Sequence, residues 1–158
     1  MRITGAKTIS DAELRATRLI NKLELRQTHP IIFEFCKAEL LADKYFHTDF
    51  EAGKSIAEII RQRTGLTENG GELVEKAFSL KNPMIKINDL ANETKESEHK
   101  GFANLIKGVF EMFRNTTTPV PKVNWDINEA DALDILSTIS LIHRRLDINI
   151  KLSTMSPS

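Results

Sequence analysis

The sequence contains very little cysteine, since Cys36 is the only one among 158 residues. A single cysteine excludes an internal disulfide. Cys36 follows an apolar run that includes Phe33 and Phe35, so we predict a buried, unreactive thiol rather than a nucleophile. The four histidines, His29, His47, His99 and His143, show none of the i, i+3 or i+4 spacings typical of zinc ligands. We therefore expect no metal site and no cofactor.

The sequence also has no excess of charge, since 22 Lys+Arg balance 22 Asp+Glu. Without a global basic field, any nucleic-acid site must be a local patch. No segment approaches the roughly 20 apolar residues that span a bilayer, and the first residues lack the apolar core of a signal peptide. With 41% hydrophobic and 28% charged residues, the chain is typical of one folded globular domain. We expect a cytoplasmic location and no contact with membranes.

Two loop motifs that mark nucleotide-binding or catalytic sites are not fully present in the sequence. Gly53-Lys54-Ser55 resembles the end of a phosphate-binding P-loop, but Thr48 stands where that motif requires a glycine. We therefore expect Gly53 to lie at a contact between helices, with Lys54 pointing to solvent. A Gly-x-Ser-x-Gly nucleophile elbow is also missing.

The hydrophobic periodicity is helical throughout, which predicts an all-α fold. We expect an irregular connection over 81–99 and a disordered tail over 149–158. The first two predicted helices cover 10–25, with a capping box at Ser10 and Glu13, and 31–46. The third is capped by His47-Thr48-Asp49 and ended by Gly65, and a short fourth helix after Asn69-Gly70-Gly71 holds Leu73, Val74, Ala77 and Phe78. The last two cover 102–113 and 128–147.

The last two helices carry the clearest apolar stripes. A connection of about fourteen residues joins them, so we expect them to pack antiparallel. The side chains that we expect to be largely buried between them are Phe102, Leu105, Ile106, Val109, Ile135, Ile139 and Ile142.

The connection between these helices is the sharpest break in the chain. Residues 112–125 read MFRNTTTPVPKVNW, with an arginine, an asparagine, three threonines and two prolines. On the residues alone, Arg114 is explained by a surface ion pair with Glu111, worth a few tenths of a kcal/mol. His143-Arg144-Arg145 is explained by the dipole at a helix C-terminus, or alternatively by phosphate binding.

Five sequence blocks add a family resemblance to this description. In order they are YFHTDFEAGKSI, TGLTENGGELVEKAFS, NPMIKIND, HKGFANLIKGVFEMFRN and INEADALDILSTISLIHRRLD. They resemble the Ymh-type family of uncharacterised bacterial proteins, within the HEPN (higher eukaryotes and prokaryotes nucleotide-binding) superfamily. The resemblance implies a HEPN-like bundle of four to five helices over 29–148, preceded by a helical extension over 1–28, and a homodimer.

The resemblance also implies a site. Many HEPN proteins are metal-independent ribonucleases whose motif is an arginine, a polar residue that is commonly asparagine, and a histidine. Arg114 and Asn115 match the start, and Pro119 stands at the histidine position. An arginine stabilises negative charge on a phosphate, whereas a histidine moves protons near neutral pH, which proline cannot do. We expect substrate contacts from Thr116, Thr117, Thr118, Lys122, His143 and Arg144.

These implications lead to three hypotheses. The first is a toxin-like endoribonuclease of a toxin–antitoxin, abortive-infection or anti-phage defence system, impaired by Pro119 and partnered by RNA and by an antitoxin or defence-system protein. The second is a non-enzymatic HEPN module that binds RNA, nucleotide or a partner protein. The third is a helical dimerisation or immunity module with no nucleic acid involved.

Overall fold

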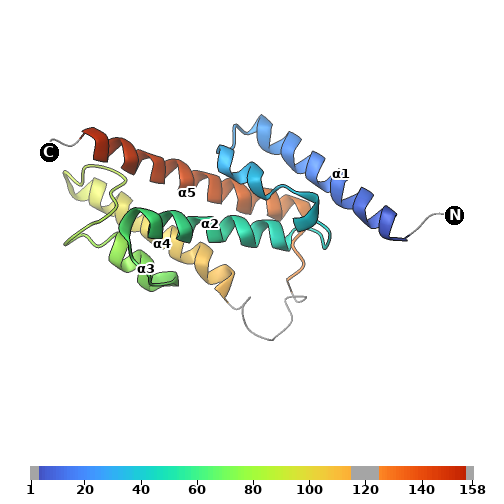
Figure 1. The fold of residues 1–158 in the computed structure, drawn as a ribbon. Coiled ribbons are helices and arrows are strands. Elements are labelled where there is room, and N and C mark those ends of the chain that lie inside the picture. Colours follow the sequence, from blue (N-terminus) through green and yellow to red (C-terminus); the bar gives the residue numbers. More distant parts are fainter. Residues whose placement is uncertain (1–3, 115–124, 156–158) are drawn as a thin grey trace. The chain divides into compact units, whose positions relative to one another are not determined.

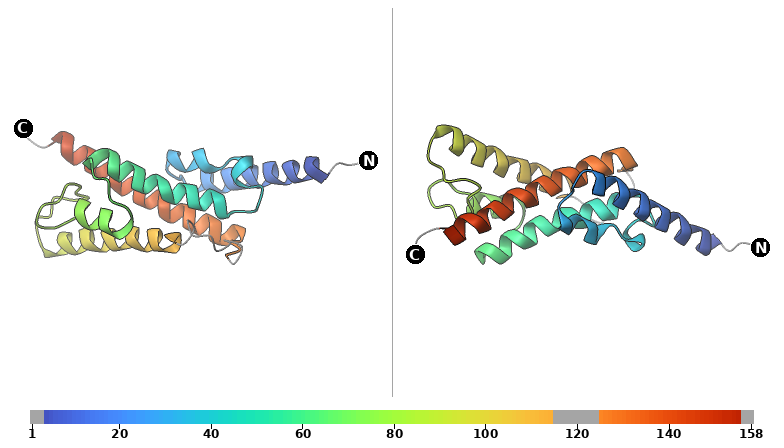
Figure 2. Two further views of the ribbon diagram at one scale, coloured as in Figure 1. Left: turned by 60° about the horizontal axis from the view of Figure 1, so that its bottom comes forward. Right: turned by 90° about the horizontal axis from the view of Figure 1, so that it is seen from above.

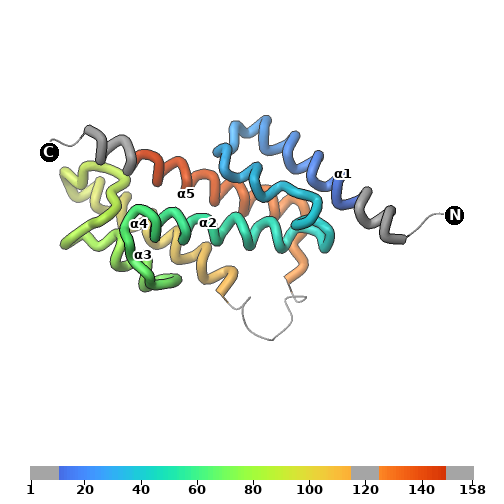
Figure 3. The backbone as a smooth tube through the Cα atoms, viewed as in Figure 1, coloured from blue at the N-terminus to red at the C-terminus, as the bar shows by residue number. Residues whose placement is uncertain are grey.

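The described part of the chain is built from helices. The computed structural model describes the backbone of residues 4–114 and 125–155, and the side chains of 11–114 and 125–148 (Figure 3). These residues form five α-helices and two short 3-10 helices, and no strand occurs among them. The predicted all-α class is confirmed.

The helices follow one another along the chain as labelled in Figure 1. Their bounds are α1 Thr4–Leu25, η1 Pro30–Phe35, η2 Ala38–Leu40, α2 Phe46–Thr64, α3 Gly70–Ala77, α4 Glu93–Met112 and α5 Glu129–Met155. α1 begins upstream of the capping box predicted at Ser10, so that prediction is wrong. α5 continues to Met155 and thus extends into the segment predicted to be a disordered tail.

The chain divides into two units. The first unit comprises described residues 4–52 and 125–141, and the second comprises 53–114 and 142–155. α2 and α5 each contribute their first part to the first unit and their remaining part to the second.

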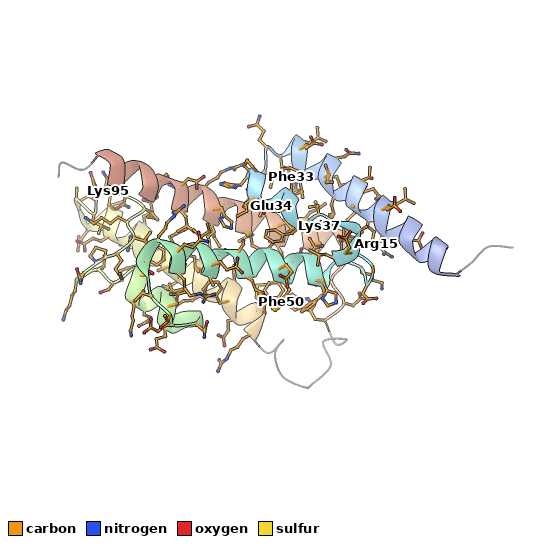
Figure 4. The ribbon with its side chains drawn as sticks, in the orientation of Figure 1. Arg15, Phe33, Glu34, Lys37, Phe50 and Lys95 are labelled. Atoms are coloured by element: carbon orange, nitrogen blue, oxygen red, sulfur yellow. The ribbon has the colours of Figure 1, made fainter. Side chains whose placement is uncertain are left out.

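The first unit has an apolar core supplied by several of its helices. α1 contacts η2 (Figures 1 and 2), and Arg15 of α1, labelled in Figure 4, donates to the backbone oxygen of Leu41 at 2.8 Å. The fully or nearly fully buried apolar side chains of this unit are Ala12, Leu19, Leu23, Ile32, Cys36, Leu41, Tyr45, Phe46, Ala52, Ile127, Ala132, Leu133, Leu136 and Ile139.

The helix predicted over 31–46 is replaced by two short 3-10 helices and turns. Pro30 fixes its own φ at the start of η1, and the ring nitrogen Nδ1 of His29 accepts from the backbone N–H of Ile31 at 3.1 Å. The following bonds join residues three apart, as from Leu41 N to Ala38 O. Lys44 has a φ of 68°, a left-handed conformation that no continuous right-handed helix can contain. Unbroken apolar content therefore misled the helix prediction here.

The helix predicted between the His47-Thr48-Asp49 cap and Gly65 is confirmed at its end but not at its start. Gly65 ends α2 with a φ of 77°, as expected of a glycine after a helix C-terminus. However, α2 begins at Phe46, so Thr48 and Asp49 lie inside its first turns and are fully buried instead of capping it.

The second unit is organised around α3 and α4, which lie side by side in Figure 1. The four apolar residues predicted for the short helix, Leu73, Val74, Ala77 and Phe78, are all buried. The ring of Phe78 packs edge-on against Phe102 of α4, with centroids 5.9 Å apart. On α2, a Cβ at Gly53 would stand 3.5 Å from the Phe113 ring. Gly53 is therefore at a helix contact, as predicted, and Lys54 is exposed.

The irregular connection predicted for 81–99 exists but is shorter. It ends at Asn92, whose side chain accepts from the backbone N–H of Lys95 and so caps α4. Ile85 and Ile87 are buried from within it, and the N–H groups of Met84 and Ile85 both bond to Ala77 O. The polar stretch before Gly101 thus belongs to α4.

Most of the side chains predicted to be buried on α4 and α5 are buried. Phe102, Ile106, Val109, Ile139 and Ile142 are at most 8% exposed, and Ile135 is half-buried. Leu105 is 37% exposed, so that prediction is wrong. The buried stripe of α4 passes through 99, 102, 106, 109 and 113, and it leaves Leu105 on the solvent side. Within the second unit, Glu98 and Arg145 pair at 3.6 Å, which brings the first half of α4 to the second half of α5, as antiparallel helices require.

Two neighbouring residues on α4 test this stripe. Ile106→Ala should lower the free energy of unfolding by about 2–4 kcal/mol, because it removes fully buried methyl groups and leaves a cavity. Leu105→Ala, the matched control, should change it by less than about 1 kcal/mol. Urea denaturation followed by circular dichroism measures both. Equal losses in the two variants would contradict the placement of the stripe.

Candidate functional site

Arg114 lies one residue beyond the C-cap Phe113 of α4. Its side chain is 70% exposed, and its Nη1 donates to Oε1 of Glu111 at 2.8 Å. The predicted ion pair is therefore present. An exposed pair of this kind contributes little stability and is readily exchanged. The guanidinium can accordingly reach a phosphate in solution with only a small loss of intramolecular interaction.

The other predicted residues of the turn fall outside the described residues. They are Asn115, Thr116, Thr117, Thr118, Pro119 and Lys122. Their assignments stay predictions.

His143 lies in the interior of the second unit. Its ring is 2% exposed, and its Nε2 is hydrogen-bonded to Oγ of Ser55 at 2.8 Å. Arg144 beside it is exposed, and Arg145 pairs with Glu98. α5 continues to Met155, so these three residues lie inside the helix and not in its last turn. The helix-dipole explanation therefore does not apply, and only the two arginines of the cluster are accessible to a phosphate.

His99 is the second histidine of this unit and is also fully buried. Its Nε2–H donates to the backbone oxygen of Phe78 at 2.8 Å, while Nδ1 has no hydrogen-bond partner among the described residues. The ring thereby ties α4 to the residue that ends α3. Neither histidine of the second unit is exposed to a substrate in this structure.

An aromatic cluster in the first unit surrounds the start of α2. The Phe46 ring stacks on Phe50, labelled in Figure 4, at 5.9 Å, and it meets the edges of His47 and Trp125 at 5.6 and 5.8 Å. Trp125 is half-buried and is the first described residue after the turn that begins at Arg114. The cluster therefore ties Trp125 to the start of α2.

The sequence interpretation missed the most perturbed titratable group. Asp49 is fully buried in the first unit, and neither carboxyl oxygen has a hydrogen-bond partner among the described residues. Burial raises the pKa of Asp49 to about 9, so its carboxyl is protonated at neutral pH. The signal was in the sequence, because Asp49 occupies the i+4 position of the buried series Tyr45, Asp49, Ala52 and Ile56.

The Cys36 thiol is a neighbour of this carboxyl. Cys36 is 5% exposed, and its Sγ–H donates to the backbone oxygen of Ile32 at 3.6 Å. Burial raises the pKa of the thiol to about 11, and the Asp49 carboxyl, which is ionised at so high a pH, adds to the shift. A thiol that stays protonated and covered is a poor nucleophile. The predicted burial of Cys36 is confirmed, and its unreactive character stays a prediction that the raised pKa favours.

The described residues offer neither a metal-binding cluster nor a membrane-spanning helix. Within that part of the chain, no group of three or more His, Cys, Asp or Glu residues could hold a metal ion. None of the helices described there combines the length and the hydrophobicity needed to cross a membrane.

Residues 26–146 match a family described as "Protein of unknown function (Hypoth_ymh)". The chain belongs to this family. The match confirms the Ymh part of the resemblance and covers Arg114 and His143, whereas the HEPN relationship stays a prediction. It begins at Arg26, so α1 lies outside the family region. No curated protein and no solved structure matches the chain.

The buried carboxyl predicts the pH dependence of stability. The folded-state pKa of Asp49, about 9, exceeds the ordinary value of 3.8, so between these values the folded state binds the extra proton. Its contribution to stability is complete below about pH 4 and is lost as the pH rises towards 9. Asp49→Asn removes this titration and should stabilise the protein at pH 8 by about 1–4 kcal/mol, with little change at pH 4.

Urea midpoints measured from pH 4 to pH 9 provide the test. Asp126→Asn is the matched control, because that carboxylate is 69% exposed. If the wild type and Asp49→Asn show the same pH profile, Asp49 does not hold the proton.

Proposed function

We propose that this protein is a HEPN-type, toxin-like endoribonuclease module that works without a metal and that is impaired in cleavage as the sequence stands. The observation that supports the proposal is the exposed guanidinium of Arg114 at the end of α4, within the family region, at the start of the turn that resembles the HEPN motif. Its target would be the phosphate backbone of RNA.

Cleavage of RNA without a metal needs a group that takes a proton from the 2′-hydroxyl and a group that protonates the leaving oxygen. Histidine serves both roles well because its ordinary pKa, about 6.5, lies near neutrality. Pro119 has no such group. His99 and His143, the two histidines of the second unit, are at most 2% exposed and each is already hydrogen-bonded. The same observation favours a second candidate function, RNA binding without cleavage.

Arg114 retains its part of the chemistry. A guanidinium keeps its charge at every physiological pH and presents a planar fork of N–H donors to phosphate oxygens. During cleavage it would stabilise the negative charge that develops on the phosphate. Asn115 would orient the substrate, and Thr116, Thr117, Thr118, Lys122 and Arg144 would add hydrogen bonds and charge.

Restoring the missing acid–base group is the first test. Pro119→His should raise RNA cleavage in the presence of a chelator by on the order of 10²- to 10⁴-fold, the usual contribution of such a group. Arg114→Ala in the Pro119→His background should abolish the gain, and Asn115→Ala should reduce it less. Degradation of labelled RNA, followed over time, measures all four proteins.

Lys100→Ala is the matched control, since Lys100 is another exposed cation on α4. It should leave the restored cleavage unchanged. If folded Pro119→His cleaves no RNA, the binding function replaces the enzymatic one. If the protein as it stands cleaves efficiently, the interpretation of Pro119 is wrong.

We further propose a twofold homodimer that brings two Arg114 turns to one substrate, because closed twofold symmetry is the commonest form of protein assembly. Light scattering at micromolar concentration should give about twice the mass of one chain. A monomer at all concentrations would remove the shared site, and each turn would then act alone. An antitoxin or another defence-system protein is the remaining proposed partner.

A further inference from the structure

Glu129, the first residue of α5, receives three donors in the first unit. Nη2 of Arg18 pairs with its Oε2 at 2.9 Å, and the Tyr45 hydroxyl donates to the same oxygen at 3.3 Å. Nζ of Lys22 bonds to the other oxygen, Oε1. The Glu129 side chain is only 16% exposed, whereas the side chains of Arg18 and Lys22 are 63% and 45% exposed, so two solvent-exposed cations hold one largely covered carboxylate. One carboxylate thus joins α1, the residue before α2 and the start of α5.

The charge of this carboxylate is stable near neutral pH. The hydrogen bond from Lys22, with the nearby charge of Arg18, lowers the pKa of Glu129 despite some desolvation. Burial and the negative charge of Glu129 raise the pKa of the Tyr45 hydroxyl. Glu129 is therefore an anion, and the Tyr45 hydroxyl a hydrogen-bond donor, near neutral pH.

Residues 125–128, directly before Glu129, are held at three further points. The Trp125 ring lies against Phe46, and Asp126 pairs with Lys44 at 3.3 Å. The side chain of Asn128 accepts from the backbone N–H of Asp131 at 2.8 Å, which caps α5. Three local contacts therefore hold the described residues 125–128, which lead into α5.

Two of the cations in this arrangement come from outside the family region. Arg18 and Lys22 belong to α1, whereas the family match begins at Arg26. Arg26 itself pairs with Asp134 of α5 at 3.7 Å, further from the turn. The added helix therefore places its charges on the first residue of α5.

We propose that Arg18 and Lys22 are positioning residues, which act through Glu129 to fix the position of Trp125, the first described residue after Arg114 in the sequence. In its effect on RNA, this inference rests on the proposed function. α1 then acts as an electrostatic clamp that the family region alone does not contain. The clamp needs the carboxylate and both α1 cations, and it needs no contact between α1 and RNA.

A direct contact between α1 and RNA predicts the opposite result for one variant. Glu129→Gln releases Arg18 and Lys22 from their anion. If these cations bound RNA phosphates themselves, their release would strengthen binding. If they act as a clamp, Glu129→Gln loosens the end of the turn and weakens binding. The sign of the change in affinity therefore separates the two explanations.

Trp125 allows the clamp to be measured without RNA, because it is the only tryptophan in the chain. In Glu129→Gln, acrylamide should quench the Trp125 fluorescence about twice as strongly as in the wild type, since loss of a partly exposed ion pair changes a local equilibrium by a small factor. Asp134→Asn is the matched control, because Asp134 is another carboxylate of α5 and it pairs with Arg26, the residue directly after α1. The control should leave the quenching unchanged.

Charge reversal supplies the rescue. Arg18→Glu with Lys22→Glu should increase the quenching of Trp125, and adding Glu129→Lys should restore it towards the wild-type value. Purely structural damage to α1 would not be repaired by a further substitution. Circular dichroism confirms that each variant keeps its helices.

RNA affinity is the second readout, measured by fluorescence anisotropy with a labelled single-stranded RNA. Glu129→Gln should weaken binding about fivefold and Asp134→Asn should not, in line with the roughly 1 kcal/mol that a partly exposed ion pair contributes at most. Equal quenching in Glu129→Gln and Asp134→Asn overturns the clamp, and so does tighter RNA binding by Glu129→Gln. If the quenching changes as expected but the wild type binds no RNA, the clamp is supported and the proposed function fails.

Discussion

The two units both depend on the burial of one continuous face of α5. In the first unit this face contributes Leu136 and Ile139, and in the second it contributes Ile142 and Leu146, all of them fully buried. An α-helix completes one turn every 3.6 residues, so these four positions lie on the same face only while the helix remains unbroken. Any kink or early end of α5 would take apolar area from one unit or the other, at a cost of about 25 cal/mol per Å².

Two polar residues interrupt that face, and each has a partner in its own unit. Oγ of Ser140 accepts from the backbone N–H of His29 at 2.8 Å, and His143 is bonded to Ser55. Buried polar groups of this kind stabilise little on balance, but they become costly when the partner is removed. Asp49 of α2 differs from these two residues, because its carboxyl is buried and has no hydrogen-bond partner among the described residues. A protein that retains such a group gives up stability at neutral pH.

Arg114, unlike the residues of this core, is exposed to solvent. Among the described residues Arg114 pairs with Glu111, whereas Trp125 contacts Phe46 and Glu129 binds the cations of α1. The guanidinium of Arg114 can therefore exchange Glu111 for an anion at little cost. In the proposed clamp, α1 would contribute from outside the family region.

The sequence by itself determined the all-α class, the short helix at Leu73–Phe78, the stop at Gly65 and the family, because periodicity, glycine conformation and ordered motifs are local properties of the chain. It also determined that Arg114 pairs with Glu111, since residues three apart on a helix are neighbours. Only the tertiary structure decided that 31–46 is not one helix, and that Leu105 faces solvent whereas Asp49 is buried. It also decided that Glu129 pairs with two cations of α1. Those outcomes depend on which side of each helix meets another, and that is set by contacts between residues up to about a hundred positions apart, where local pattern carries no information.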